Sequence, residues 1–489
     1  MFFTMVRKEL LDNLLSFRST TAIILCVLLM LLSSYTLREK YERQLGEYNA
    51  AVITHRKSLD EAASLQNLML GGYTLDKRPA LLSVLTAGLE GVGKTITVNI
   101  TEEPAFENSE TSIEPLSGLF GVLDFAFITR IVISLLALLF TYDAIAGEKE
   151  RGTLKLMLSN AVPRDLVILS KAVGSYLSLL LPLAISTLTG LVVMMLSTQI
   201  HFDGEAGLRL LLSGLVSLLY IWGFTVIGLF ISARTDRPAT ALFILLLIWV
   251  VFVLAVPKAS NLLASQIYQI PSVQEIQGQK TTIEQEISNE ANQKIMKVSQ
   301  ESAKELHLKL TQQWEAEGKS PKAHPKEFQA AIVSGMMELI ADVQKETLEK
   351  MNIERDKIQV AYERQVGRQL DLAMNLSRIS PASSYTFAMT SLANTGLARQ
   401  RAFLQRAKQY QREFARYLNI KLAEGKGLGL NPGDPNDKAD LSDMPQFRPK
   451  APTFNASLNE SMIDILLLLI MGVVFFMATY VSFLRSDVL

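Results

Sequence analysis

The sequence IVISLLALLFTY, residues 131–142, is an uninterrupted apolar run that ends at a charged stretch, DAIAGEKERGTLKLMLSNAVPR, residues 143–164. A helix rises about 1.5 Å per residue, so a bilayer core about 30 Å thick needs about 20 mostly apolar residues. Residues 123–142 supply that length, although Asp124 and Arg130 interrupt the first part. An apolar helix that stops at a cluster of charges is typical of a chain leaving a membrane.

Five further stretches combine comparable length with few charges, and they are residues 20–37, 172–197, 208–232, 239–256 and 462–484. Together the six runs predict an all-α polytopic membrane protein with six transmembrane helices. The 49% hydrophobic content of the 489 residues is therefore concentrated in the spans.

Lysine and arginine gather on one side of these spans. They precede the first span at Arg7, Lys8 and Arg18, recur in residues 143–171 and 232–239, and follow the last span at Arg485, whereas residues 198–207 contain none. Because basic residues resist translocation, we expect both termini in the cytoplasm and residues 38–122 and 257–461 outside. The start of the chain has no small-residue cleavage site, which favours a retained anchor over a signal peptide.

These boundaries divide the chain into five parts. They are residues 1–37 with an amphipathic helix and the first span, 38–122 as a first outer segment, 123–256 with four spans and a cytoplasmic loop at 143–171, 257–461 as an outer helical domain, and 462–489 with the last span and a cytoplasmic end.

The outer domain carries two apolar stripes at helical spacing. The first is Ile276, Ile283, Ile287, Ala291, Ile295, Val298, Leu306 and Leu310, and the second is Ile332, Met336, Leu339, Val343, Met351, Ile358, Val366 and Leu370. A Gly/Pro-containing break at 318–325 separates them. The stripes predict a hairpin of two helices of about 40 residues, reaching about 60 Å.

Other signals in the outer segments are local. Ser380 and Pro381 are typical of a helix start, Thr395-Gly396 of its end, and a further helix is expected over 397–424. The Gly/Pro/Asp-rich residues 425–452 indicate a loop. In the first outer segment we expect a helical extension over 39–66 and a short strand in the alternating residues 95–100.

Composition excludes several kinds of site. Lys+Arg and Asp+Glu are both 48, which gives no reason to expect a nucleic-acid partner. Cys26 is the single cysteine and the four histidines are scattered, so neither a disulfide framework nor a metal site is expected. No nucleophile–base pair is recognisable, and we expect no catalytic residue and no cofactor.

A phosphate-loop pattern occurs at Gly88, Gly93, Lys94 and Thr95, in the form GxxxxGK[ST]. Such a loop should leave a buried strand and enter a helix whose N-terminus holds the phosphates. Here an alternating segment follows, and the predicted topology places it outside the cytoplasm. We therefore interpret the match as a chance glycine-rich turn.

The cytoplasmic loop resembles that of type-2 ABC exporter permeases, whose second and third spans are joined by GEKERGTL…PR…K. Residues 147–154, Pro163, Arg164 and Lys171 match this form. The resemblance extends over all six spans, from the amphipathic residues 6–19 to the inner residues 232–239. The long hairpin departs from the short outer loops of most members and is similar to a subgroup with an insertion between the fifth and sixth spans, in which residues 378–396 also match.

The resemblance implies a permease in the bacterial inner membrane that works as a homo- or heterodimer of six-span halves with soluble ATPase subunits. Residues 148–158 would form one coupling helix that docks on the ATPase, and hydrolysis would belong to that partner. The coupling residues implied are Glu148, Glu150, Arg151, Gly152, Thr153, Leu154, Met157 and Leu158. From the residues alone, a helix lying on lipid headgroups remains an alternative, with its charges simply solvated.

Asp124 and Arg130 are charges within the predicted second span. A charge near the bilayer centre costs about 2.5–3.5 kcal/mol on the insertion scale, so each is a functional candidate. The two lie about 240° apart on an α-helix and do not share a face. We favour a snorkelling or interhelical role for Arg130 over substrate gating.

The sequence thus predicts a non-catalytic ABC permease that moves an unidentified substrate. One alternative is ATP-driven force transmission through the hairpin to an envelope protein without substrate flux. A receptor would need a cytoplasmic output domain, and a secondary transporter would need inverted repeats or broken spans, and neither feature is recognisable.

Overall fold

The computed structural model describes residues 1–61, 68, 71–91, 93–99, 104, 106, 122–159, 162–316, 325–423 and 441–485. The elements are α1 (Phe2–Leu14), α2 (Phe17–Glu61), β1 (Tyr73–Asp76), the 3₁₀ turn η1 (Leu81–Val84), β2 (Thr95–Val98), α5 (Phe125–Phe127), the π-helical η2 (Ile128–Ile133), α6 (Ser134–Thr141), α7 (Ala146–Glu150), α8 (Thr153–Ser159), α9 (Arg164–Met195), α10 (Gly204–Arg234), α11 (Pro238–Trp249), the π-helical η3 (Val250–Ala255), α12 (Val256–Ile267), α13 (Val273–Ala316), α14 (Pro325–Ser377), α15 (Pro381–Leu392), α16 (Leu397–Ala423) and α17 (Phe454–Leu484).

In the described part of the chain six helices are long and apolar enough to cross a membrane, and each covers all or nearly all of one of the six predicted spans. The all-α polytopic fold is therefore confirmed. The first of these helices continues well past the predicted span as α2, so the expected extension is helical to Glu61, and residues 62–67 lie outside the described residues. Polar side chains cap several starts, for example Asp203 at α10, which accepts from the amide of Ala206 at 2.8 Å.

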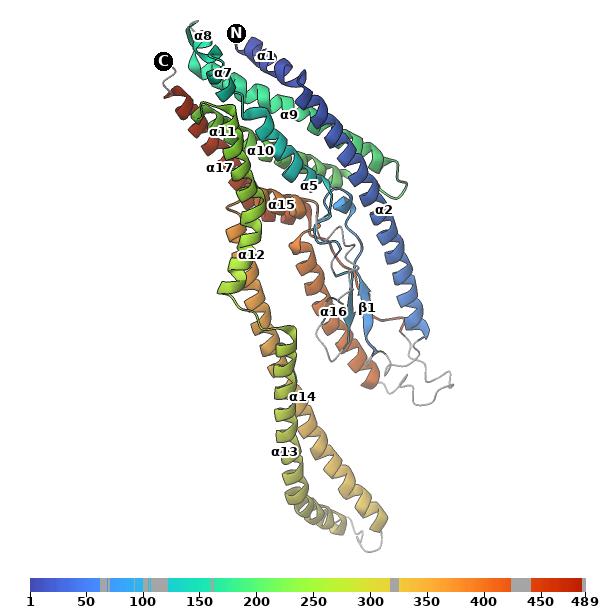
Figure 1. Cartoon of the computed structure of the whole chain (residues 1–489). Coiled ribbons are helices and arrows are strands. Elements are labelled where there is room, and N and C mark those ends of the chain that lie inside the picture. The colour runs from blue at the N-terminus through green and yellow to red at the C-terminus, as the bar shows by residue number, and fades with distance from the viewer. Residues whose placement is uncertain are drawn as a thin grey trace. The chain divides into compact units, whose positions relative to one another are not determined.

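The spans form one compact unit, residues 1–258 and 377–489. Within it α10 is central and contacts α6, α9, α11, α15 and α17, while α1 and α2 both pack on α9. Figure 1 shows α7, α8, the start of α1 and the end of α17 at one end of the spans, whereas β1 and α16 lie at the other. The spans therefore alternate in direction.

Two π-helical turns, η2 and η3, interrupt the second and fifth spans, and α15 packs against both. A π turn displaces carbonyls from the regular helical ladder, and these need partners in an apolar surrounding. The Arg130 carbonyl accepts from Ser134 Oγ at 2.5 Å and from the Tyr220 hydroxyl at 2.9 Å. The Phe252 carbonyl accepts from Ser380, the side chain that also caps α15. The predicted cap at Ser380 is thus confirmed, and it has a second use.

A small antiparallel sheet packs on α16 in the same unit. The predicted strand forms β2, and its partner β1, which the sequence did not reveal, pairs Tyr73 with Val98 and Asp76 with Thr95. The sheet contributes Leu75, Ile96 and Val98, and α16 contributes Phe403, Ala407, Tyr410, Phe414 and Leu418, to one buried cluster. The helical spacing of the α16 residues explains why one face of this charged helix is buried.

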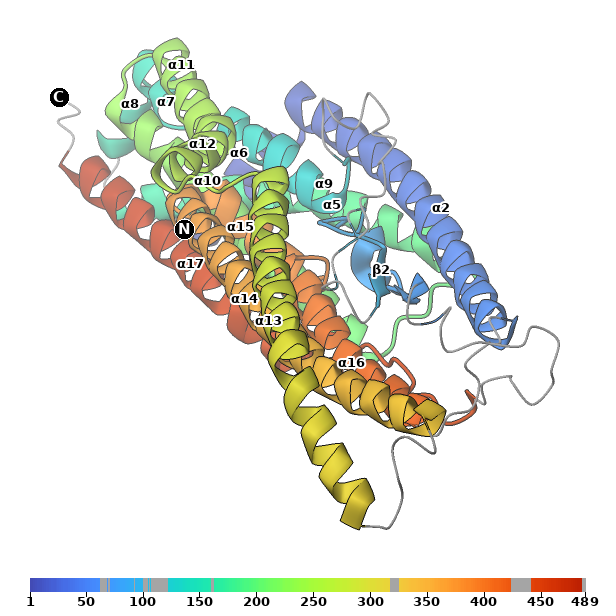
Figure 2. The ribbon, with the colours of Figure 1, turned by 90° about the horizontal axis from the view of Figure 1, so that it is seen from below.

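The second compact unit, residues 259–376, contains most of the long hairpin. Helices α13 and α14 run side by side (Figure 2), and their antiparallel register is fixed by ion pairs of Lys294 with Glu346 and of Lys350 with Glu290. Ile287 and Val343 are buried in the seam, as the two apolar stripes predicted, whereas Leu339 is exposed. Of the predicted break at 318–325, residues 318–324 lie outside the described residues, and Pro325 begins α14.

The residues of the predicted outer domain over 257–461 are divided between the two compact units. Residues from 377 onward group with the spans, because α15 packs on α10 and α17 and Arg378 forms a two-pronged ion pair with Asp464 of α17 at 2.7 and 3.1 Å. The predicted helix over 397–424 forms as α16 to Ala423, and its last residue and residues 425–440 of the predicted loop lie outside the described residues.

Candidate functional site

The cytoplasmic segment singled out by the sequence forms two short helices, α7 and α8. Gly152 lies between them with φ of +72°, a conformation that ends α7 and reverses the chain. The expectation of one continuous helix over residues 148–158 is therefore wrong. A glycine in the middle of a predicted helix is a typical signal for such an end.

Helix α7 is attached to the end of α10 by hydrogen bonds. Ser232 accepts from the amides of Ile145 and Ala146 at 3.0 Å each, and donates to the carbonyl of Tyr142 at 2.9 Å. Lys149 donates to the Ala233 carbonyl at 2.6 Å. These bonds satisfy polar groups at the point where the second span ends, and they attach the segment to the end of α10.

A buried ionic cluster ties the segment to two further helices. The Lys171 ammonium of α9 lies 2.8 Å from a carboxylate oxygen of Glu9 in α1 and 2.8 Å from one of Glu148 in α7. Only 2% of the Lys171 side chain is exposed. A side chain at Gly174 would place its Cβ 2.6 Å from the Glu9 Cβ, so glycine there permits the close approach of α1 to α9. The ion pairs of this cluster therefore connect α1, α7 and α9.

Helix α8 turns its apolar side into the protein. Leu154 is fully buried against Val167 and Ile168 of α9 and Phe483 of α17, and Met157 packs partly against the same cluster. Thr153, Lys155, Leu156 and Ser159 of α8 are exposed, and so are Glu150 and Arg151 at the end of α7. The side chain of Leu158 lies outside the described residues.

The implied coupling residues thus fall into two groups. Glu150, Arg151 and Thr153 lie on the exposed face, where a docking contact requires them. Glu148 pairs with Lys171 and Leu154 is buried, so both point inward, and their coupling role stays a prediction. Leu156, with 68% of its surface exposed, was missed, although its position between the inward Leu154 and Met157 would have identified it on a helical wheel.

The glycine-rich turn at Gly88 and Gly93 has φ values of +50° and +65°. Lys94 forms an ion pair with Glu47 of α2 at 3.3 Å, and Thr95 begins strand β2 instead of a helix. The arrangement lacks the helix N-terminus that a phosphate loop needs, which supports the interpretation as a turn.

The two intramembrane charge candidates have separate partners. Asp124 caps α5 by accepting from the Phe127 amide at 2.7 Å and also accepts from the Ala87 amide at 3.0 Å. Arg130 donates to Thr386 Oγ1 of α15 at 3.2 Å. Arg130 therefore contacts another helix, and its structural or substrate-gating role stays a prediction.

Among the residues that the structure describes, no three histidine, cysteine, aspartate or glutamate side chains come together in a way that could hold a metal ion. The hydrogen bonds and ion pairs around α7 and α8 attach these two helices to the spans.

Comparison with known proteins places these features in context. Residues 4–488 match the family described as "ABC-2 family transporter protein". The chain is also 31% identical over 178 residues to a protein of Stutzerimonas stutzeri named "Probable ABC transporter permease protein NosY". That alignment covers 36% of this chain and 58% of the relative, so the similarity extends over little more than half of the relative's length.

Proposed function

Because the chain belongs to the ABC-2 family of transporter proteins, we propose that it is the permease subunit of an ABC transporter. It pairs with a second six-span half and with two soluble ATPase subunits, which bind and hydrolyse ATP. The observation that carries this proposal is the rigid attachment of α7 and α8 to the spans, combined with an exposed polar face that contains Leu156.

The attachment supports mechanical coupling. A displacement of α7 is transmitted to α9 and α1 through Lys171, and to α10 through Ser232 and Lys149. Coupling between distant sites needs a chain of packed and hydrogen-bonded groups of this kind. A loop without these contacts would absorb the movement of an ATPase instead of passing it to the spans.

The direction of the apolar side favours a protein partner over a lipid surface. A helix lying on headgroups turns its apolar side to the lipid. Helix α8 instead turns Leu154 and Met157 into its own protein and exposes Leu156 among charges of both signs. An apolar residue surrounded by charged residues matches the arrangement of a protein interface, in which an apolar centre has a polar rim.

Co-purification with the ATPase subunit tests the docking face. Leu156→Asp combined with Arg151→Glu should release the ATPase, since both residues are exposed and neither supports the fold. Leu154→Asp would be unsuitable because it would insert a charge into a buried cluster. Arg412→Glu, an exposed charge reversal on α16, is the matched control and should retain the ATPase. Retention of the ATPase by the double variant would rule out this docking face.

The membrane orientation belongs to the same proposal. The face of α7 and α8 and both termini are cytoplasmic, in a bacterial inner membrane, and the sheet, α16 and the hairpin lie outside. The excess of basic residues in the connections at the α7 end supports it.

A second function is favoured by the hairpin. Helices α13 and α14 contain 44 and 53 residues, which correspond to lengths of about 66 and 80 Å at 1.5 Å per residue. Such a lever would transmit ATP-driven motion to an envelope partner without moving a substrate. Reconstituted ATPase–permease complexes distinguish the two functions: ATP-dependent flux of a candidate substrate supports transport, while ATP-dependent movement of labels on the hairpin without flux supports force transmission.

A further inference from the structure

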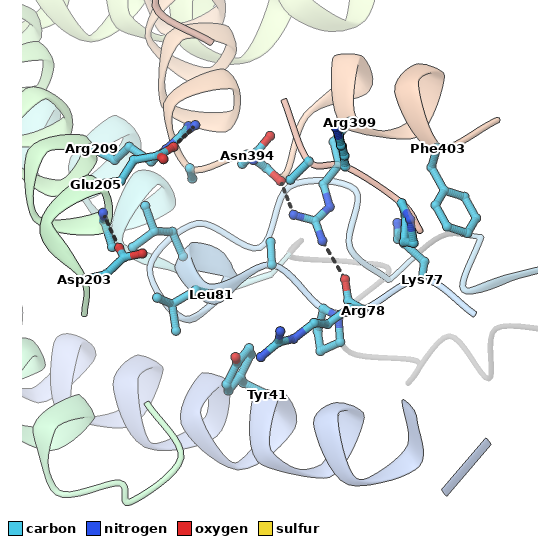
Figure 3. Close-up of a pocket in the computed structure, with 18 of the residues that line it drawn as sticks. Tyr41, Lys77, Arg78, Leu81, Asp203, Glu205, Arg209, Asn394, Arg399 and Phe403 are labelled. Atoms are coloured by element: carbon cyan, nitrogen blue, oxygen red, sulfur yellow. Dashed lines mark hydrogen bonds and ion pairs between the residues drawn. The ribbon is translucent and has the colours of Figure 1, made fainter. Parts of the chain in front are cut away.

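A cavity of about 570 Å³ lies at the end of the spans opposite to α7 and α8. Four parts of the span unit enclose it: the end of the first span at Tyr41, the segment from Lys77 to Leu82, the start of α10, and α16 with the chain that precedes α17. Figure 3 shows the charged side chains converging on it. Its volume is within the range of about 300–1,000 Å³ that small-molecule sites occupy.

Positive charge is in excess around the cavity. Its cationic side chains are Lys77, Arg78, Arg209, Arg399, Arg406 and Lys450. The carboxylates that line it or pair with these cations in the described part of the chain are Asp203, Glu205, Glu90 and Glu413. Six cations therefore face four carboxylates, and such a balance attracts an anion.

Two of the arginines already form ion pairs with carboxylates of the protein. Arg209 pairs with Glu205 at 2.8 Å and donates to the Leu392 carbonyl at 2.9 Å. Arg406 pairs with Glu413 at 3.0 Å. These side chains hold the walls of the cavity together, and their donors are not available to a ligand.

Other donors remain available. Arg78 and Lys450 are exposed, and their side chains make no ion pair or hydrogen bond with another described residue. In Figure 3 the Arg78 side chain extends across the cavity toward Tyr41. The Lys77 side chain is only 4% exposed, and its ammonium is 3.8 Å from Glu90, too far for a good hydrogen bond. Three cations can therefore donate to a ligand.

Lys77 and Arg399 share a single carboxylate, Glu90, which lies 3.1 Å from the Arg399 guanidinium. Burial lowers the pKa of both Lys77 and Arg399, and the nearby Glu90 carboxylate opposes this shift in both. The charge of Arg399 lowers the pKa of Lys77 further, and the charges of Arg209 and Arg78 do the same for Arg399. Two buried cations on one carboxylate are short of negative charge. An anion in the cavity would supply it, so the site is organised for binding before the ligand arrives.

The position of the cavity at the ends of the spans indicates which kind of anion it binds. Tyr41 follows the predicted end of the first span, and Glu205 and Arg209 belong to the first turns of α10. Aromatic and basic residues at the ends of spans lie at the depth of lipid headgroups. A phosphate has more acceptor oxygens than a carboxylate and matches several separated cationic donors. Leu81 and Phe403 add apolar surface for the organic part of a ligand.

We propose that this cavity binds a phosphate ester, held by Lys77, Arg78 and Lys450. The phosphate belongs either to the headgroup of an anionic membrane lipid or to a soluble ester of the same chemistry. The site does not depend on coupling to an ATPase, so it goes beyond the proposed permease function.

Binding to the purified full-length protein tests the proposal with two probes. Calorimetry with glycerol 3-phosphate measures the soluble ester, and native mass spectrometry from nanodiscs of phosphatidylglycerol, against phosphatidylcholine, measures the lipid. The variant Arg78→Glu/Lys450→Glu changes only exposed side chains and should lower affinity at least about tenfold, because charge-assisted hydrogen bonds are lost. Lys77→Met is a second variant with the same expected direction, and Arg412→Glu is the control that should bind normally.

Binding of either probe that is lost in Arg78→Glu/Lys450→Glu and kept in Arg412→Glu supports the site, and the probe that binds identifies the source of the phosphate. Absence of binding of both probes to the unaltered protein would overturn the proposal. An equal loss in Arg412→Glu would also overturn it, since the attraction would then come from general surface charge.

Discussion

Replacing Lys171 with methionine should destabilise the span unit by removing the cation from the buried cluster. The Lys171 ammonium lies 2.8 Å from Glu9 and 2.8 Å from Glu148, and the three side chains are 2%, 18% and 14% exposed. Lys171→Met leaves two carboxylates close together and without their counter-ion. Breaking a buried ion pair costs about 3–5 kcal/mol, and the partial exposure of both carboxylates places the expected loss near the lower limit, about 3 kcal/mol.

The free energy of unfolding can be measured by SDS titration of the purified protein in mixed micelles. Lys155→Met removes an exposed lysine from α8 and should change it by less than about 0.5 kcal/mol. The triple variant Lys171→Met/Glu9→Gln/Glu148→Gln should recover most of the loss, because its carboxylates are neutral amides.

Two results would refute this reasoning. If Lys171→Met were as stable as Lys155→Met, the cluster would not hold α1 and α7 to α9. If the triple variant were no more stable than Lys171→Met, unpaired carboxylates would not be the cause of the loss. In the proposed transporter, Lys171→Met should also reduce transport per ATP hydrolysed more than it reduces ATPase binding, since the docking face is unchanged.

Three further predictions concern backbone geometry, packing and orientation. Gly152→Ala should cost about 1–2 kcal/mol of unfolding free energy from backbone strain alone, because φ is +72° and no atom lies within 4 Å of the added Cβ; an unchanged stability would contradict this. Gly228→Ala should cost about 1–3 kcal/mol in the same assay, since its Cβ would overlap the Thr141 side chain, and Thr141→Ala should recover part of the loss; an unchanged free energy of unfolding in Gly228→Ala would show that α10 and α6 can separate. After Cys26→Ala removes the single cysteine, a cysteine at Leu156 should react with a membrane-impermeant thiol reagent only after the cells are opened, whereas one on α13 should react in intact cells; the reverse pattern would invert the proposed orientation.

The sequence by itself determined the features that depend on local pattern. Apolar length predicted the six spans, the spacing of Ile287 and Val343 predicted the paired helices of the hairpin, and Ser380-Pro381 predicted the start of α15. Each of these follows from the chemistry of residues within about two turns of one another, so no knowledge of distant contacts is needed.

Tertiary structure decided which side chains of the cytoplasmic segment face a partner. The sequence showed charges and apolar residues at residues 148–158, but whether Glu148 is solvated or buried depends on Glu9 and Lys171, which are remote in the chain. The same holds for α15, whose burial depends on α10 and α17, and for the cavity, where Lys77 and Lys450 meet across more than 370 residues. Charge and burial at these sites are properties of packing between helices, and packing is set by contacts that no local pattern contains.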